Sequence, residues 1–197
     1  MNYLAHAFLS FDHEKILVGN LISDFVKGKT KFNFPGDIQK GIALHRAIDT
    51  FTDTHEATRL AKNIFKPSYR LYSGAFVDIV YDHFLANDPD EFNEETLRNF
   101  SERVYAILDQ HVEYLPWRFS RMFPYMKSQN WLLNYRTKWG TESSFYGLAR
   151  RARYIDEVET AGLLFEANYK ALHECYRIFF PDIKSFAYNM CKDISNL

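Results

Sequence analysis

Apolar residues recur every three or four positions along nearly the whole chain, a spacing that places them on one face of an α-helix. A first helix is predicted over residues 13–27, with Asp12 as its N-cap and Gly28 as its end. No alternating apolar and polar run bounded by turn residues indicates a strand. The other expected helices cover residues 37–60, 71–87, 93–115 with Asn93 as the cap, 157–180 and a stretch beyond Pro181, with shorter pieces at 128–139, ended by Gly140, and at 142–153. The pattern shows no repeat or linker, and it predicts a single all-α domain, a helical bundle over residues 1–197.

The segment 71–87 is apolar around almost its whole circumference, which predicts a buried helix at the centre of the bundle. Asp78 and Asp82 lie four residues apart within it. A buried carboxylate is costly unless a positive group faces it. The residues alone leave two interpretations open, a salt bridge to an arginine or lysine and a bound metal ion.

Two more predicted helices carry polar residues at the same four-residue spacing. His45, Asp49 and Asp53 recur in GIALHRAIDTFTDTH, and Asn20 and Asp24 recur in GNLISDFVKG. Residues four apart are neighbours on one helix face, and each such column alone is also typical of a solvated surface. If the three columns face one another, they form an oxygen-rich pocket with one or two imidazoles. This donor set suits Mn²⁺, Mg²⁺ or Fe rather than a zinc site built from thiolates.

A metal centre built from inward-projecting carboxylates and histidines favours hydrolysis, because the metal lowers the pKa of bound water and neutralises charge on a phosphoryl oxygen. A phosphoester is therefore the expected substrate. Among the other histidines, His6 is either a ligand or a core residue. His83 points about 100° away from Asp82 on a helix and flanks the column. His111 falls on the apolar stripe of its helix and is expected in the core.

Composition and charge narrow the classes of partner. The chain has 197 residues, of which 47% are hydrophobic and 17% aromatic, and this is enough to build a core without help from a partner. The net charge of −1 argues against a chain that is basic throughout. Residues 78–113 nevertheless hold ten acidic residues and two arginines, whereas residues 118–153 hold eight basic residues and one glutamate. The second region is expected to attract anions.

The cysteines and the hydropathy of the chain indicate the cellular compartment in which the protein is expected. Cys175 and Cys191 lie sixteen residues apart, without the spacing of a zinc or redox motif, and are predicted to be reduced thiols. No apolar run approaches the roughly 20 residues that span a bilayer. The N-terminal segment lacks the basic start of a signal peptide. We therefore expect a cytoplasmic protein with neither membrane nor nucleic acid as a partner.

Five segments of the chain resemble the bacterial acyl carrier protein phosphodiesterases in their order and spacing. They are MNYLAHAFLS, GNLISDFVKG, GIALHRAIDTFTD, DIVYDHFLAND and SQNWLLNYR, which together span roughly residues 1–140. The resemblance implies an all-α fold like a rearranged HD-type metal phosphohydrolase. It also implies a divalent cation, with Mn²⁺ preferred and Mg²⁺ or Fe²⁺ as alternatives, and removal of 4′-phosphopantetheine from holo acyl carrier protein. The adjacent His-Asp pair of the wider HD superfamily is absent, and Asp82-His83 reverses its order, which leaves the number of metals open.

Carried onto this sequence, the resemblance implies that Asp24 is the essential acid, with His83 and Asp53 as further catalytic groups. The implied metal ligands are His6, Asp24, His45, Asp49, Asp78 and Asp82. In this mechanism the metal activates water for attack on the phosphodiester that joins phosphopantetheine to a serine of the carrier protein.

Acyl carrier proteins are small and acidic, which gives the basic region a role. Lys27, Arg150 and Arg151 are predicted to dock the partner. Two other functions stay open at this point. The first is an HD-like phosphohydrolase that acts on a free nucleotide or another small phosphoester, and the second is a metal-free helical binding module.

Overall fold

Helices make up all of the regular structure in residues 1–195, the part of the chain that the computed structural model describes, with side chains through residue 193. The all-α prediction is confirmed. The α-helices are α1 (Tyr3–Phe8), α2 (Glu14–Ile22), α3 (Gly36–Thr54), α4 (Glu56–Tyr69), α5 (Ser73–Ala86), α6 (Glu94–Gln110), α7 (Trp117–Ser128), α8 (Trp131–Asn134), α9 (Lys138–Ala149), α10 (Glu159–Ala167) and α11 (Tyr169–Ser195). Short 3₁₀ helices cover Ser23–Phe25, Gly28–Asn33, Arg70–Tyr72 and Val112–Tyr114.

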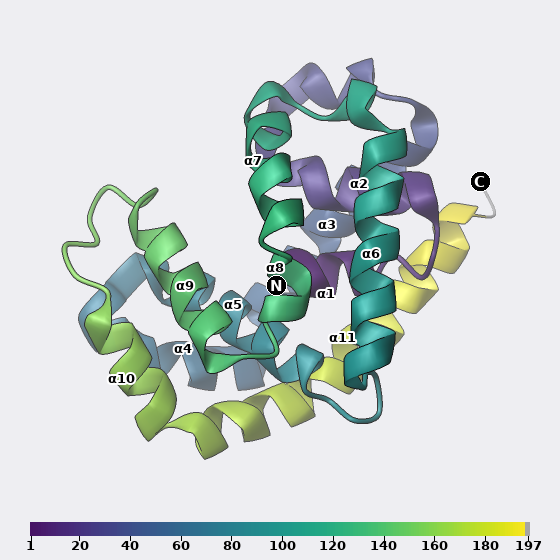
Figure 1. Ribbon diagram of the computed structural model, residues 1–197. Coiled ribbons are helices and arrows are strands. Elements are labelled where there is room, and N and C mark those ends of the chain that lie inside the picture. The colour runs from purple at the N-terminus through teal and green to yellow at the C-terminus, as the bar shows by residue number, and fades with distance from the viewer. Residues whose placement is uncertain (196–197) are drawn as a thin grey trace.

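Helix α5 lies at the centre of this arrangement, in contact with α1, α4, α9 and α11 (Figure 1). Its residues Phe76, Val77 and Tyr81 are fully buried, which confirms the prediction of a central buried helix. Helix α11 runs along the lower edge of the molecule in Figure 1, from α10 to the right-hand side. None of the helices described combines the length and hydrophobicity needed to cross a bilayer.

Helices α2 and α3 cross so closely that only glycine fits at the crossing. A Cβ atom added to Gly19 would lie 2.1 Å from the carbonyl oxygen of Ile38, and one added to Gly41 would lie 2.1 Å from that of Ile16. Both obstacles are backbone atoms, so no side-chain movement relieves the clash. The glycine pair therefore fixes the distance between the residue after Gly19, which is Asn20, and His45, one turn beyond Gly41.

The predicted helix over residues 37–60 is two helices, α3 and α4. His55 interrupts it with an extended backbone, and its Nδ1 accepts a hydrogen bond from the Ala57 N–H. A histidine that caps the next helix carries none of the usual sequence signals of an N-cap, which are serine, threonine, aspartate or asparagine.

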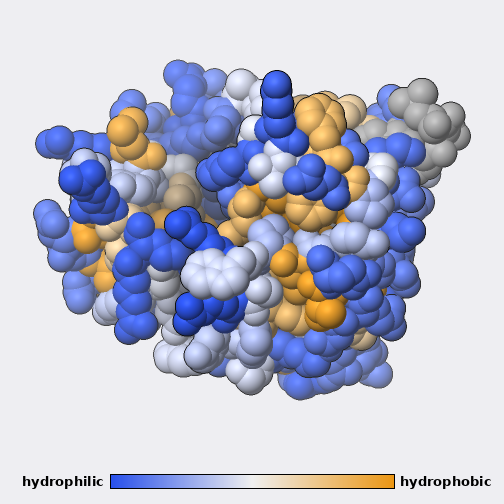
Figure 2. Space-filling view, turned by 90° about the horizontal axis from the view of Figure 1, so that it is seen from above, coloured by the Kyte–Doolittle hydropathy of each residue, from blue (hydrophilic) through white to orange (hydrophobic). Residues whose placement is uncertain are grey.

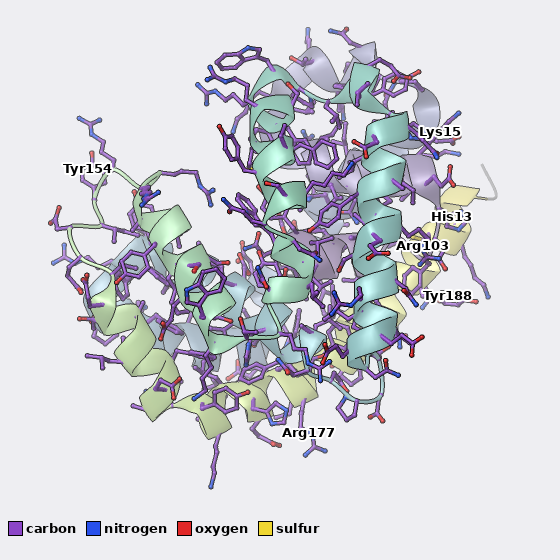
Figure 3. The ribbon with its side chains drawn as sticks, viewed as in Figure 1. His13, Lys15, Arg103, Tyr154, Arg177 and Tyr188 are labelled. Carbon is purple, nitrogen blue, oxygen red and sulfur yellow. The ribbon has the colours of Figure 1, made fainter. Side chains whose placement is uncertain are left out.

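The start and end of the predicted helix over residues 13–27 also differ from the structure. Asp12 has a positive φ of 64° and pairs with Arg103 instead of capping α2. Arg103 lies at the right-hand side of the molecule near His13 (Figure 3). At its other end α2 stops at Ile22, and the chain tightens into the 3₁₀ helix Ser23–Phe25 that carries Asp24.

Two residues expected to end helices lie inside them. Gly140 belongs to the first turn of α9, whose N-cap is Thr137. A Cβ there would lie 2.0 Å from the carbonyl oxygen of Asn134, so this glycine permits a close approach to α8. Pro181 lies within α11, which continues because Phe180 before it and Ile183 after it are both buried.

Helix α6 begins as predicted but ends earlier. The side chain of Asn93 accepts a hydrogen bond from the Thr96 N–H in a capping box, as the sequence indicated. The helix ends at Gln110 instead of running to residue 115. His111 caps it and is half-buried, with Nδ1 donating to the Ile107 carbonyl, so its expected place in the core is only partly right.

Candidate metal centre

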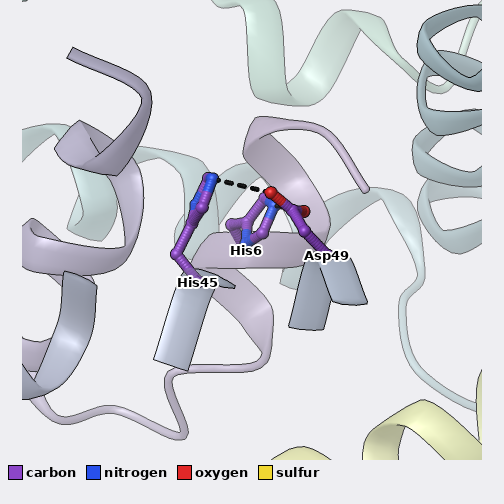
Figure 4. A group of neighbouring side chains, drawn as sticks. All are labelled: His6, His45 and Asp49. Atoms are coloured by element: carbon purple, nitrogen blue, oxygen red, sulfur yellow. Dashed lines mark ion pairs between the residues drawn. The ribbon is translucent and has the colours of Figure 1, made fainter. Parts of the chain in front are cut away.

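Two histidines and one aspartate meet between α1 and α3 (Figure 4). Nε2 of His45 lies 3.1 Å from one carboxylate oxygen of Asp49, and Nε2 of His6 lies 3.3 Å from the other. One donor atom from each residue lies within 4.8 Å of the others. Both imidazoles are buried, whereas the Asp49 side chain keeps 42% of its exposure. The cluster is therefore open to solvent on the aspartate side.

Asn20 orients both imidazoles from α2. Its side-chain oxygen lies 2.8 Å from Nδ1 of His6, and its backbone carbonyl oxygen lies 2.7 Å from Nδ1 of His45. The amide nitrogen of Asn20 donates to the His6 carbonyl and to Ser10 Oγ, and this assigns the side-chain oxygen to the His6 ring. Both partners are acceptors, so each Nδ1 carries a proton. This leaves each Nε2 as the nitrogen that can bind a metal, which for His45 requires loss of the proton on Nε2, and it is how second-shell groups fix histidine in metal sites.

The two rings have opposite tendencies to bind a proton. Burial, together with the nearby His45, lowers the pKa of His6 to about 4. Burial opposes protonation of His45 too, but the carboxylates of Asp24 and Asp49 outweigh it and raise the pKa of His45 to about 9. For Asp49 burial is likewise outweighed, and the contacts with both histidines hold its pKa well below the ordinary value.

The Nε2 atom of His6 is buried and has no hydrogen-bond partner among the described residues. Because Nδ1 holds the proton of this neutral ring, the lone pair of Nε2 faces the Asp49 carboxylate oxygen at 3.3 Å. Two electron-rich atoms at this distance repel unless a positive charge lies between them. The donors therefore fit a divalent cation, which would accept the lone pair and the carboxylate together.

Asp24 joins this cluster from the 3₁₀ helix Ser23–Phe25. Its Oδ1 lies 3.3 Å from Nε2 of His45, and this contact lowers the pKa of the aspartate. The Asp24 side chain is 72% exposed, so the carboxylate is accessible from solvent. The structure thus brings together four of the six residues predicted as ligands: His6, Asp24, His45 and Asp49.

Asp78 and Asp82 face other positive groups. Asp78 accepts from the ammonium of Met1 at 2.7 Å. Asp82 accepts from the backbone N–H groups at the start of α1, including that of Leu4 at 2.7 Å. Burial raises the pKa of Asp82 to about 7 in spite of these donors. The half-buried Asp78 and the buried Asp82 therefore face a terminal ammonium and a helix N-terminus, rather than an arginine or lysine, and these contacts hold α1 against α5.

Two predicted catalytic residues lie apart from the cluster. Asp53 pairs with Lys62 at 2.6 Å. Nδ1 of His83 lies 2.8 Å from the Tyr135 carbonyl oxygen, and its Nε2 lies 2.9 Å from the Tyr169 hydroxyl. Among the residues that the structure describes, no hydrogen bond or ion pair joins the side chain of either residue to His6, His45 or Asp49.

The comparison with known proteins bears on the whole chain. A model of the acyl carrier protein phosphodiesterase family matches residues 1–183. The chain belongs to this family. Similar proteins named acyl carrier protein phosphodiesterase come from Yersinia pestis, 31% identical over 92% of this chain and 94% of the relative, and from Photorhabdus laumondii, 30% identical over 96% of both. One from Escherichia coli is 33% identical over 92% of this chain and 94% of the relative. No solved structure matches the chain.

The predicted docking residues are exposed, and two of them border a cleft. Lys27 lies between two 3₁₀ helices: Ser23–Phe25, which carries Asp24, and Gly28–Asn33, which carries Lys29 and Lys31. Arg150 and Arg151 follow α9 and line a cleft with Tyr3. The cleft itself was not predicted, although Asn2, Tyr3 and positions 129–135 fall in two of the segments that resemble the family, because no pattern along the chain shows that these segments meet. Hydrophilic side chains cover most of the face seen in Figure 2, with hydrophobic residues exposed in its middle.

Proposed function

We propose that the protein is a divalent-metal-dependent phosphodiesterase that hydrolyses the 4′-phosphopantetheine group from holo acyl carrier protein and leaves the apo form. Membership of the acyl carrier protein phosphodiesterase family supports the reaction. One observation carries the metal dependence: the Nε2 atoms of His6 and His45 both face Asp49, while Asn20 holds both Nδ1 protons.

The proposed ligands are His6, His45 and Asp49, with Asp24 at the exposed side of the cluster. Mixed imidazole and carboxylate donors suit Mn²⁺ and Fe²⁺, whereas Mg²⁺ prefers oxygen donors and water. We therefore propose Mn²⁺, and keep Mg²⁺ and Fe²⁺ as alternatives that activity measurements separate.

In the proposed hydrolysis, the bound cation, Asp24 and the two acids of α5 have different roles. A bound divalent cation would supply Lewis acidity, lowering the pKa of water and neutralising phosphoryl charge. Asp24 stays ionised at neutral pH, because the His45 contact lowers its pKa. It is also the exposed member of the group, and is therefore the residue placed to take a proton from the attacking water or to complete the ligand set. Asp78 and Asp82 act by positioning α1, which carries His6.

The proposed partner is an acidic carrier protein, for which Lys27, Arg150 and Arg151 provide exposed positive charge. Complementary charge of this kind raises the association rate and is weakened by salt. The cytoplasmic location and the absence of a nucleic-acid partner stay predictions.

Intact-mass measurement of the carrier protein tests the proposal. We expect holo carrier protein incubated with the enzyme and Mn²⁺ to lose the mass of the phosphopantetheine arm, and a chelator to prevent the loss. Asp24→Ala is expected to abolish the reaction while leaving the thermal midpoint near that of the wild type, because the side chain is exposed. Hydrolysis of small phosphodiesters with no change in holo carrier protein would support a small-molecule phosphohydrolase instead.

A further inference from the structure

A cleft of about 580 Å³ is lined by Tyr3 of α1, the helix that carries His6, and the metal chemistry leaves this cleft without a role. Its size falls in the range of small-molecule sites. Helix α9 forms one wall, from Trp139 in its first turn to Arg150 just after its end. At 1.5 Å per residue these two positions are about 16 Å apart along the helix, which suits an extended, chain-like ligand.

The walls of the cleft combine aromatic faces with neutral hydrogen-bonding groups. Trp139 and Tyr146 are 67% and 47% exposed, so large aromatic surfaces remain available for contact. Amide and hydroxyl side chains lie among them, including Asn134 and Ser144. This mixture suits a ligand that alternates methylene groups with amides.

The charged side chains that line the cleft are all positive. Its charged side chains are Arg150 and Arg151, and no carboxylate belongs to the residues that line it. Arginine is the side chain best suited to phosphate, because its planar fork donates two parallel hydrogen bonds. One end of the cleft therefore favours a phosphate group.

Aromatic contacts join this cleft to Phe25, the residue after Asp24. Phe25, next to Asp24, packs against Phe119 with ring centroids 5.5 Å apart, and Phe119 lies 6.5 Å from the Tyr3 ring. Tyr3 in turn lies 6.4 Å from Trp131, and both line the cleft. Tyr3 is also one helical turn before His6 on α1. Burial raises the pKa of Tyr3 to about 12, and the charges of Arg151 and Asp24 both act on its hydroxyl.

We propose that this cleft binds the phosphopantetheine arm of the carrier protein, with the phosphodiester at the Arg151 and Tyr3 end and the amide-linked chain along α9 toward Trp139. The assignment rests on the proposed function, since that function supplies the ligand. It places the scissile bond at the end of the cleft that ring contacts connect to Phe25, the residue after Asp24, and lets the aromatic side chains cover the methylene groups of the arm.

Two measurements test this assignment, and the first needs no turnover. The chain has three tryptophans, of which Trp131 and Trp139 line the cleft. We expect 4′-phosphopantetheine, and more weakly pantetheine without the phosphate, to change the tryptophan emission of the wild-type protein in a saturable way. No change with either probe overturns the proposal, as does an equal change with inorganic phosphate alone.

The second measurement uses a variant whose larger side chain narrows the cleft. A Cβ at Gly147, which lines it, meets no atom within 4 Å, so Gly147→Leu fills space without a backbone clash. We expect Gly147→Leu to raise the KM for holo carrier protein by at least about tenfold and the smaller Gly147→Ala to raise it less. Gly36→Leu is the control, because a Cβ there is equally unobstructed but lies outside the cleft.

The outcomes keep the two proposals separate. A wild-type KM in folded Gly147→Leu overturns the cleft assignment even if the carrier protein is hydrolysed. If the wild type does not hydrolyse holo carrier protein, the proposed function fails, and the emission titration still decides whether the cleft binds the arm. The same titration decides the question if Gly147→Leu does not fold.

Discussion

The imidazole rings of His6 and His45 lie stacked, with centroids 3.9 Å apart and planes 15° apart. Two rings at this spacing cannot both be protonated without strong repulsion, and their pKa values of about 4 and about 9 differ accordingly. The stack turns both Nε2 atoms toward Asp49. Near neutral pH, Nε2 of His45 therefore carries a proton and Nε2 of His6 carries a lone pair, and both face the carboxylate of Asp49. A divalent cation bound there would replace the proton and accept the lone pair.

Asn20 is predicted to act by positioning His6. Asn20→Ala removes the acceptor of the His6 Nδ1 proton, so the ring loses its fixed tautomer, and we expect Mn²⁺ affinity to fall about 10- to 100-fold by calorimetric titration. Ser10→Ala is the matched control. It removes the buried hydroxyl that accepts from the Asn20 amide, but it leaves the Asn20 side-chain oxygen that faces Nδ1 of His6. Equal affinities in the two variants would contradict the role.

The pKa of His45 predicts how Mn²⁺ binding depends on pH. The ring is protonated below about pH 9 in the metal-free protein, and Mn²⁺ must displace that proton from Nε2. Apparent affinity should therefore rise about tenfold per pH unit between pH 6 and 8, with about one proton released per ion bound. Titration calorimetry in buffers of different ionisation enthalpy measures the proton release. A flat profile would place the ion elsewhere.

His83 is predicted to contribute to stability rather than to turnover. Burial lowers its pKa to about 4, below the ordinary 6.5, so the unfolded state binds more protons between these values. The stability that His83 contributes is present above pH 6.5 and is lost as the pH falls toward 4. We expect His83→Gln to be less stable at pH 7 and to show a smaller loss of unfolding free energy over that window. A fall in kcat with unchanged stability would instead restore the catalytic role predicted from the sequence.

The crossing of α2 and α3 predicts a large stability effect. A methyl group at Gly41 clashes with the backbone of α2, so Gly41→Ala should cost about 3 kcal/mol or more in unfolding free energy and also weaken Mn²⁺ binding. Gly36→Ala, on the same helix with open space around it, should be neutral or slightly stabilising. Denaturant unfolding of the two variants tests this contrast. Similar values would show that the close crossing is not required.

Local sequence patterns predicted some elements well. The apolar circumference of residues 71–87 predicted the buried helix α5, and Asn93 was a strong cap signal for α6. Two of the missed helix ends depend on contacts with another segment of the chain. Asp12 pairs with Arg103 instead of capping α2, and Gly140 is in a helix because α8 packs against it. A pattern within one segment carries no information on such partners.

The candidate site was predicted in part for the same reason. The four-residue columns placed His45 and Asp49 on one face, and the structure puts them in contact. The pattern could not indicate that the ammonium of Met1 would lie against Asp78, or that the N-terminus of α1 would lie against Asp82. Both contacts link residues more than 70 positions apart.

Pulsed electron paramagnetic resonance of Mn²⁺ bound to protein with ¹⁵N-labelled histidine tests the central claim most directly. We predict coupling of the ion to two imidazole nitrogens, one of which is lost in His6→Gln and the other in His45→Gln. Mn²⁺ that binds without histidine nitrogen coupling, or that couples equally in both variants and the wild type, would contradict a metal centre at His6, His45 and Asp49.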